Sequence, residues 1–156
     1  MNRILYAGIG SREVPEYYYK LIRTLSEALD PTHFLRSGGA RGCDRAFANG
    51  STHKDIIRPD DATPEAIAYA AQFRSNFDTY TPEVQQLFGR NAMIILGRDL
   101  RTPVSRVICW TPEALLSGGT GHALRIAQKN RIPITNLGDP ETVRDILARG
   151  ILSLTV

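Results

Sequence analysis

The sequence has few of the residues and motifs that mark several common protein classes. Its two cysteines, Cys43 and Cys109, show neither Cys-x-x-Cys nor Cys/His spacing, so we expect two small buried residues and no disulfide framework or metal site. No apolar run approaches the roughly 20 residues that cross a bilayer, and the first residues enter a strand pattern where a signal peptide would have an apolar segment. We therefore expect a cytoplasmic protein that does not engage a membrane and that holds neither a metal nor a cofactor.

Lysine is also scarce, with 3 lysines against 16 arginines in a chain of net charge +3. A compositional bias of the source genome explains this imbalance as well as a binding role does, and the excess charge is small for a protein that lives on nucleic acid. Position is more informative, because Arg12, Arg36, Arg41 and Arg45 lie in or beside glycine-rich turns and the planar guanidinium suits phosphates. With 156 residues, of which 42% are hydrophobic, the chain is expected to form one domain over residues 1–156.

Short apolar runs alternate with helical patterns along the chain. We predict strands at residues 3–8, 33–36, 54–58, 107–110 and 132–137, with a candidate edge strand at 151–156. We predict helices at residues 15–29, 41–49, 119–129 and 141–149, and two more between 63 and 87 with a break near 78–81. Residues 92–97 fit either a strand or the end of the second of these helices, and we favour the helix. The alternation predicts an α/β fold: a Rossmann-like, doubly wound, mainly parallel sheet of about five or six strands with helices on both faces.

Three glycine-rich turns follow predicted strands, at Gly8–Ser11, within Leu35–Phe47 and at Ser117–Gly121. Parallel strands place such turns at one edge of the sheet, where α/β proteins bind their ligands. Unpaired N–H groups at a helix start also favour an anion. The three turns therefore predict a phosphate-binding pocket.

The first two turns exclude two familiar nucleotide sites. Gly8-Ile9-Gly10-Ser11 begins like a dinucleotide fingerprint but lacks its third glycine, and no Gly-Lys-Ser/Thr follows the second turn as a Walker motif requires. Ser11 is either a helix N-cap or a ligand contact together with Arg12. Arg41 either reaches a phosphate or pairs with Asp44 on the helix surface, and Asp44 can accept from a sugar hydroxyl.

Other side chains near this edge offer aromatic and acid–base chemistry. Trp110 closes a strand, where it either stacks on a base or packs in the core, and His122 either titrates near the ligand or has a surface or capping role. His33 and His53 are interpreted as structural. Among the carboxylates near the edge, which also include Glu113 and Asp139, Glu13 and Asp44 are the candidate catalytic residues for cleavage of a glycosidic bond.

Two segments resemble a known family. Ser37-Gly38-Gly39-Ala40-Arg41-Gly42-Cys43-Asp44 is similar to the Ser-Gly-Gly-Ala-Arg-Gly-Ile-Asp motif of the DNA-processing protein A family, and residues 87–95 resemble its Phe-Pro-x-Arg-Asn-Arg-Ile-Ile segment. The wider SLOG superfamily, which includes the LOG phosphoribohydrolases, shares this Rossmann-like fold. The third turn resembles the LOG motif Pro-Gly-Gly-x-Gly-Thr-x-x-Glu, but Ser117 replaces its proline, His122 its threonine and Arg125 its catalytic glutamate.

The resemblance implies that Arg41 and its turn bind phosphate, that Arg90 and Asn91 line the same pocket, and that the protein forms a homodimer or a larger homo-oligomer. The candidate ligand-binding residues are thus Gly8, Gly10, Ser11, Arg12, Ser37, Gly38, Gly39, Ala40, Arg41, Gly42, Asp44, Arg90, Asn91, Trp110, Gly118, Gly119, Thr120, Gly121 and His122.

Three functions are compatible with these residues. The leading hypothesis is a stand-alone SLOG-type domain that binds a nucleotide or nucleotide-derived small molecule, as a sensor or sequestering protein for a signalling nucleotide. The first alternative is an enzyme of the N-glycosidase or phosphoribohydrolase type that acts on nucleoside phosphates through Glu13 or Asp44. The second is a protein that binds single-stranded DNA, as the family resemblance and the arginine bias suggest. Because Arg125 stands where the LOG glutamate belongs, the sequence favours binding over catalysis.

Overall fold

Within residues 2–150, the centre of the molecule is an open sheet of five parallel strands, in the order β3-β2-β1-β4-β5. The computed structural model describes residues 2–150. The strands are β1 (Ile4–Gly10), β2 (His33–Ser37), β3 (Lys54–Ile56), β4 (Arg106–Trp110) and β5 (Ile134–Asn136). The central strand β1 pairs with β2 on one side, where Tyr6 lies beside Leu35, and with β4 on the other, where Tyr6 lies beside Arg106.

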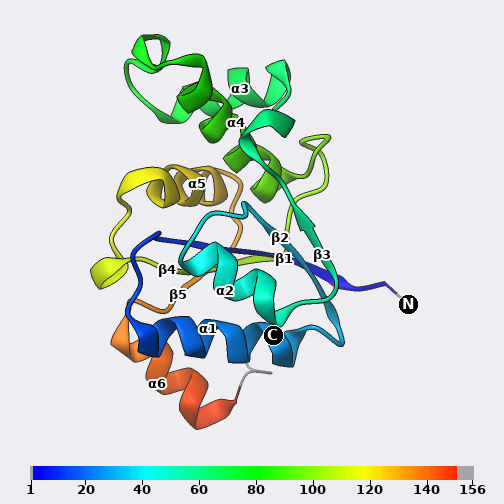
Figure 1. The fold of residues 1–156 in the computed structure, drawn as a ribbon, viewed down its shortest axis with the longest axis vertical. Coiled ribbons are helices and arrows are strands. Elements are labelled where there is room, and N and C mark those ends of the chain that lie inside the picture. Colours follow the sequence, from blue (N-terminus) through cyan, green and yellow to red (C-terminus); the bar gives the residue numbers. More distant parts are fainter. Residues whose placement is uncertain (1, 151–156) are drawn as a thin grey trace.

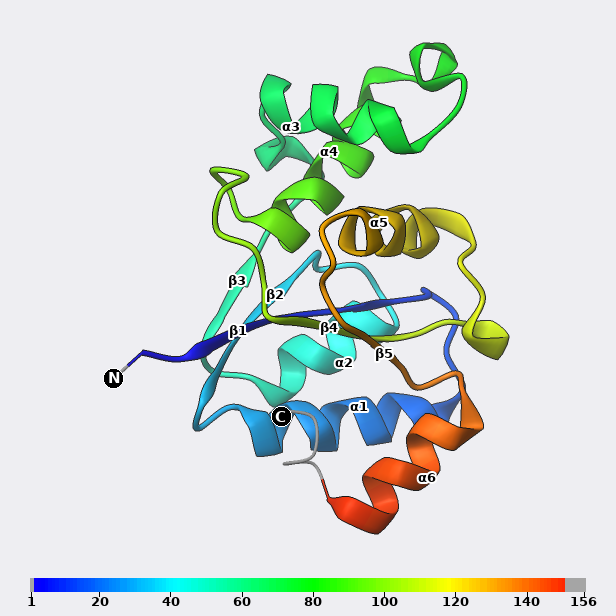
Figure 2. The same cartoon turned by 180° about the vertical axis from the view of Figure 1, so that it is seen from behind.

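Helices cover both faces of this sheet (Figure 1). One face packs against α1 (Glu16–Leu29), α2 (Cys43–Gly50) and α6 (Pro140–Arg149). The opposite face packs against α4 (Pro82–Leu96) and α5 (Gly118–Lys129), and the short helix α3 (Pro64–Ala70) lies on α4 farther from the sheet. Figure 2 shows the same two layers from behind, with the sheet between them.

Successive side chains of each strand pack in two different hydrophobic cores, because they point to opposite faces of the sheet. In β1, Tyr6 packs in the core beneath α1 and α2, whereas Ala7 packs in the core beneath α4 and α5. In β4, Cys109 belongs to the α4 core and Trp110 to the α1 core. The strands are therefore buried on both faces and are apolar on both, as expected of a parallel sheet between two layers of helices.

The predicted fold class is confirmed, and the element boundaries move by a few residues. Helix α4 continues to Leu96, so residues 92–97 end a helix as favoured from the sequence. Two helices do occupy residues 63–96, but the break between them runs from 71 to 81 and contains two 3-10 turns, Ala71–Phe73 and Phe77–Thr79. The predicted edge strand at 151–156 lies outside the described residues.

Two strands are shorter than predicted. β3 ends at Ile56, two residues before Arg58, and β5 begins at Ile134. Pro133 precedes β5 and has no N–H to donate, and its carbonyl accepts from Val107 before the strand begins. Within residues 2–150, no helix is both long enough and apolar enough to cross a bilayer.

Candidate phosphate-binding site

The chain reverses its direction of travel across the sheet between the neighbouring strands β1 and β4. After β1 it enters α1 on one face, and after β4 it enters α5 on the other face (Figure 2). Such a switch point leaves a crevice at the carboxyl ends of the strands. Two adjoining cavities, of about 630 and 300 Å³, lie at this edge.

The two cavities differ in their chemistry. The larger one, called the large cavity below, lies between the segments that follow β1, β2 and β4 and residues 84–94 of α4. It is lined by both apolar side chains and glycine-rich backbone. The smaller one, called the arginine site below, lies over the turn after β2. Its lining residues are Arg12, Gly38, Gly39, Ala40, Arg41, Arg58, Pro59, Leu87 and Arg90. Arg12, Arg41 and Arg90 also line the large cavity, so the two are continuous.

Arg90 is the buried cation of the arginine site. Helix α4 carries it inward until 6% of its surface is exposed, and its Nη1 donates to the carbonyl oxygens of Gly38 (2.6 Å) and Ile57 (3.4 Å). Its Nε is buried and has no hydrogen-bond partner among residues 2–150. A buried guanidinium stays charged, and an unmatched buried donor costs about 1–3 kcal/mol. Arg90 therefore favours an acceptor ligand in the cavities that it lines.

Two exposed arginines, Arg12 and Arg58, add positive charge to the same place. Burial lowers the pKa of Arg90, Asp44 raises it, and the charges of Arg12 and Arg58 lower it again, so both cations lie within electrostatic reach of the buried one. Neither Arg12 nor Arg58 forms an ion pair within residues 2–150. The arginine site thus gathers three cations that the protein itself does not fully neutralise.

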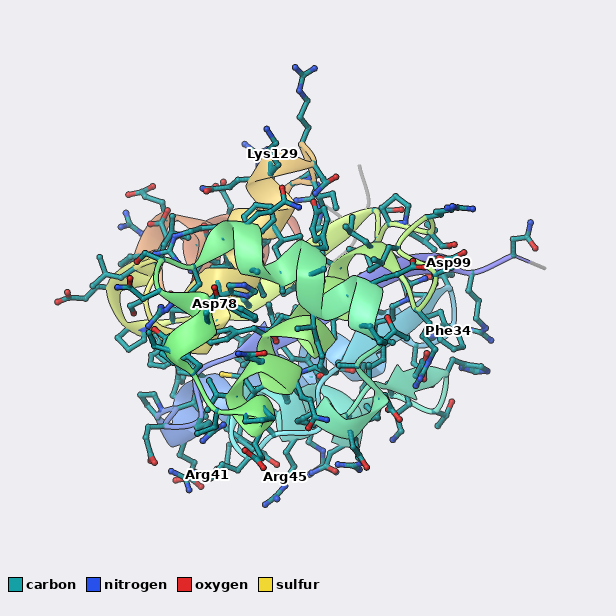
Figure 3. All side chains as sticks on the ribbon, turned by 90° about the horizontal axis from the view of Figure 1, so that it is seen from above. Phe34, Arg41, Arg45, Asp78, Asp99 and Lys129 are labelled. Atoms are coloured by element: carbon teal, nitrogen blue, oxygen red, sulfur yellow. The ribbon has the colours of Figure 1, made fainter. Side chains whose placement is uncertain are left out.

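Arg41 lies at the rim of the site. It does not pair with Asp44, as one reading of the sequence suggested, but with Glu13 across the neighbouring turn, at 2.6 Å between Nη2 and Oε1. Both side chains are largely exposed, and Figure 3 shows Arg41 and Arg45 extending outward from the same side of the molecule. An ion pair so open to solvent is weak and salt-sensitive, which leaves Arg41 available to a charged ligand.

The carboxylate of Asp44 fills the interior of the second glycine turn. Asp44 lies in the first turn of α2, has 5% of its surface exposed, and accepts a hydrogen bond from the N–H of Ala40 at 3.3 Å. Burial raises the pKa of Asp44 to about 6, although Arg90 and the N–H groups of Ala40, Gly10 and Gly38 act in the opposite direction. The turn amides expected to hold a phosphate thus face a carboxylate of the protein, and the open side of the turn is the side that carries the arginines.

Two glycines of this turn are needed for close approach. A Cβ on Gly38 would lie 2.8 Å from Oδ2 of Asp44 and closer still to Nη1 of Arg90, so the backbone passes directly between the two charges. Gly42 has a φ of +80° and presents its open side to the carbonyl of Arg12. An L side chain is strained in that conformation, and here it would also collide with backbone.

The third glycine turn is open toward the large cavity. Gly118 has no neighbouring atom within 4 Å of an added Cβ, and Gly119 has Leu87 at 3.9 Å. The side-chain amide of Asn91 donates to the carbonyl of Gly119 at 3.1 Å, which fixes the turn to α4. Gly118, Gly119, Thr120 and Asn91 all line the large cavity.

Several predicted contact residues lie away from both cavities. His122 is fully buried, its Nε2 contacts the carbonyl of Ala70 at 3.1 Å, and burial lowers the pKa of its imidazole. Trp110 packs on Tyr18 of α1, with ring centroids 5.5 Å apart, on the face opposite α4. The remaining residues that line neither cavity are Gly8, Ser37, Gly42 and Gly121.

These residues instead have structural roles. The hydroxyl of Ser37 donates to the carbonyl of Gly8 at 2.6 Å, which ties β2 to β1 just below the site. The open side of Gly121 faces the backbone of Leu116. His122 packs against the ring of Phe88 at 4.5 Å between centroids, so it joins α5 to α4.

Arg58 is a site residue that the sequence reasoning missed. It lies two residues after the end of β3, and the carboxyl ends of all parallel strands lie at one edge of the sheet. The same rule that selected the three glycine turns would have selected Arg58, but no glycine drew attention to its turn. Of the two candidate catalytic residues, Asp44 is buried beside the large cavity and Glu13 is exposed at its rim.

No family model and no curated protein matches this chain. A solved structure of DNA processing protein A from Helicobacter pylori, reported for its single-stranded DNA binding mode, is similar over 95% of this chain and 73% of that chain. The TM-score is 0.58 and the sequence identity 21%. This chain therefore has a fold like that of the DNA processing protein.

Proposed function

We propose that this protein binds single-stranded DNA and that the arginine site binds a phosphate of its backbone. The observation that carries the proposal is the arrangement of Arg12, Arg58 and Arg90 around an open turn, with the buried Nε of Arg90 left without an acceptor among residues 2–150. The guanidinium fork matches phosphate oxygens in geometry and charge. The fold of a DNA processing protein and the two motif segments give independent support.

The open shape of the arginine site favours a phosphate on a long chain over the carboxylate of a small acid. It is a shallow, open site of about 300 Å³ with exposed Arg12, Arg41 and Arg58 around one buried cation, which suits a group on a long chain that continues past the rim. Arg45 lies in the first turn of α2, four residues after Arg41, and extends from the same side (Figure 3). A strand that leaves the site over α2 would therefore meet further positive charge.

Salt-dependent binding tests this function directly. Anisotropy of a fluorescein-labelled 20-nucleotide oligothymidylate should report binding that weakens as salt increases, with a slope of about −0.7 per phosphate contact in a log–log plot. Arg58→Ala should weaken binding and reduce that slope by about one contact. Arg101→Ala is the matched control, because Arg101 is exposed in the loop before β4, at the opposite edge of the sheet. No binding at low salt, or equal affinities of the Arg58→Ala and Arg101→Ala variants, would overturn the proposal.

The second candidate is a free nucleotide or nucleotide-derived ligand, which the large cavity favours. A volume of about 630 Å³ is within the roughly 300–1,000 Å³ range of small-molecule sites, and apolar side chains of α4 face glycine backbone across it. A thermal-shift screen with nucleoside mono- and diphosphates separates the two candidates. Stabilisation by a mononucleotide at micromolar concentration would support the small ligand, and stabilisation by oligothymidylate alone would support the strand.

A further inference from the structure

Asp44 lies directly beside the arginine site, against the backbone of Gly38. Its carboxylate and the guanidinium of Arg90 approach the backbone of Gly38 from two sides, yet they do not form an ion pair within 4.0 Å. Asp44 borders the large cavity, and Arg90 borders both cavities. A phosphate bound to Arg90 would therefore place a second negative charge near a carboxylate that is already shielded from water.

The charged groups around Asp44 come from each neighbouring element. Arg90 of α4 faces it directly, and Arg12 of the turn after β1 and Arg58 after β3 lie around Arg90. Arg41, at the rim of the site, is paired with Glu13. The adjacent thiol of Cys43 is buried, and burial raises its pKa to about 12, so it remains neutral between pH 5 and pH 8. Asp44 is the carboxylate whose charge raises the pKa of the buried Arg90.

We propose that phosphate binding at the arginine site is coupled to the uptake of one proton by Asp44, so that affinity for single-stranded DNA rises as the pH falls. The coupling rests on the proposed function, because it requires an anion at this site. An ionised Asp44 offsets part of the charge of Arg90 and repels the phosphate. When Asp44 is protonated, it no longer offsets the charge of Arg90, so Arg90 attracts the phosphate more strongly. By linkage, the bound phosphate in turn favours the protonated form of Asp44.

The sign of the pH dependence follows from the free protein. Burial raises the pKa of Asp44 to about 6, so the carboxyl is largely ionised at pH 8 and largely protonated at pH 5. If the bound phosphate raises that pKa by about one unit more, the dissociation constant at pH 5 should be about tenfold lower than at pH 8. Phosphodiesters and thymine do not titrate in this range, so an oligothymidylate isolates the contribution of the protein.

Two variants assign the effect to Asp44. Asp44→Asn should bind the 20-nucleotide oligothymidylate with the same affinity at pH 5 and pH 8, close to that of the wild-type protein at pH 5. His53→Gln is the matched control, because it removes an imidazole at the opposite edge of the sheet, beside Asp30. It should keep the tenfold dependence of the wild-type protein. A loss of pH dependence in His53→Gln, or its persistence in Asp44→Asn, would overturn the proposal.

Calorimetry on the wild-type protein avoids the risk that Asp44→Asn fails to fold. Titration with oligothymidylate at pH 6.5, in two buffers of different ionisation enthalpy, should show the uptake of about half a proton per site. Binding with no proton uptake and no pH dependence would refute the coupling and leave the proposed function intact. No binding at any pH between 5 and 8 would overturn both.

Discussion

The close approach of Arg90 and Asp44 to Gly38 makes Gly38→Ala a sharp test of how the site is built. The added methyl group would lie 2.8 Å from both Oδ2 of Asp44 and Cζ of Arg90, and closer to Nη1. Arg90 is buried and hydrogen-bonded to Gly38 and Ile57, so its guanidinium has little freedom to move aside. The variant must therefore displace the guanidinium or open the turn.

The cost can be bounded from the interactions that are lost. Inserting a methyl group into a packed site costs about 1–3 kcal/mol, and a hydrogen bond from a charged donor contributes about 1.5–3 kcal/mol. Because the same displacement produces both losses, we expect a total near 2 kcal/mol. For a domain of this size that corresponds to a melting temperature lower by about 4–8 °C. Binding of oligothymidylate should fall together with stability, since the displaced guanidinium is the buried group that we propose binds phosphate.

Urea unfolding and anisotropy of the same preparations measure the two effects. Gly119→Ala is the matched control, because an added methyl group there has Leu87 at 3.9 Å, an ordinary contact, and lies in the first turn of α5. That variant should be as stable as the wild-type protein or slightly more stable. If Gly38→Ala unfolds at the same urea concentration as Gly119→Ala and binds as tightly, the reasoning about Arg90 and Asp44 is wrong.

Two further predictions concern other carboxylates. Burial opposes the ionisation of Asp30, but hydrogen bonds from residues 51–53 dominate and hold its pKa below the usual range, so its stabilisation is present above pH 4 and is lost as the pH falls below that value. Asp30→Asn should cost about 1 kcal/mol at pH 7, allowing for solvent screening, and less at pH 2.5; a urea-unfolding difference that grows on acidification would contradict this. Glu13→Gln frees Arg41 from an exposed ion pair, so stability should change by less than about 0.5 kcal/mol while oligothymidylate binding tightens about threefold, whereas weaker binding would show that Glu13 assists the ligand.

The sheet and the edge that carries the cavities could be predicted because they follow from local patterns. Alternating apolar runs and helices predict a parallel sheet, and a glycine turn after a strand predicts which edge holds the ligand. Arg90 could not be selected in this way, because it lies mid-helix in α4 and was identified through the motif resemblance. Its burial depends on the turn after β2, which is 52 residues away in the chain.

The side on which a residue faces was harder to predict than the element that carries it. Trp110 and Cys109 are neighbours in β4, and one faces the α1 core while the other faces the α4 core, beside the cavities. The alternation within the strand does not tell which of the two sets of side chains points toward the face that carries the cavities. His122 begins a buried face of α5, and a glycine motif alone does not separate the turn that meets ligand from the helix residues that pack behind it. Self-association, a cytoplasmic location, the wider superfamily and the glycosidase alternative stay predictions.

The most direct test of the central claim is the salt dependence of oligothymidylate binding in the wild-type protein and in Arg12→Ala and Arg58→Ala. If the arginine site binds backbone phosphate, each variant should weaken binding across sequences alike and reduce the log–log salt slope by about 0.7, while Arg101→Ala leaves both unchanged. Binding that keeps the wild-type slope in both variants would place the DNA elsewhere on the protein. The absence of binding at low salt would contradict the account altogether.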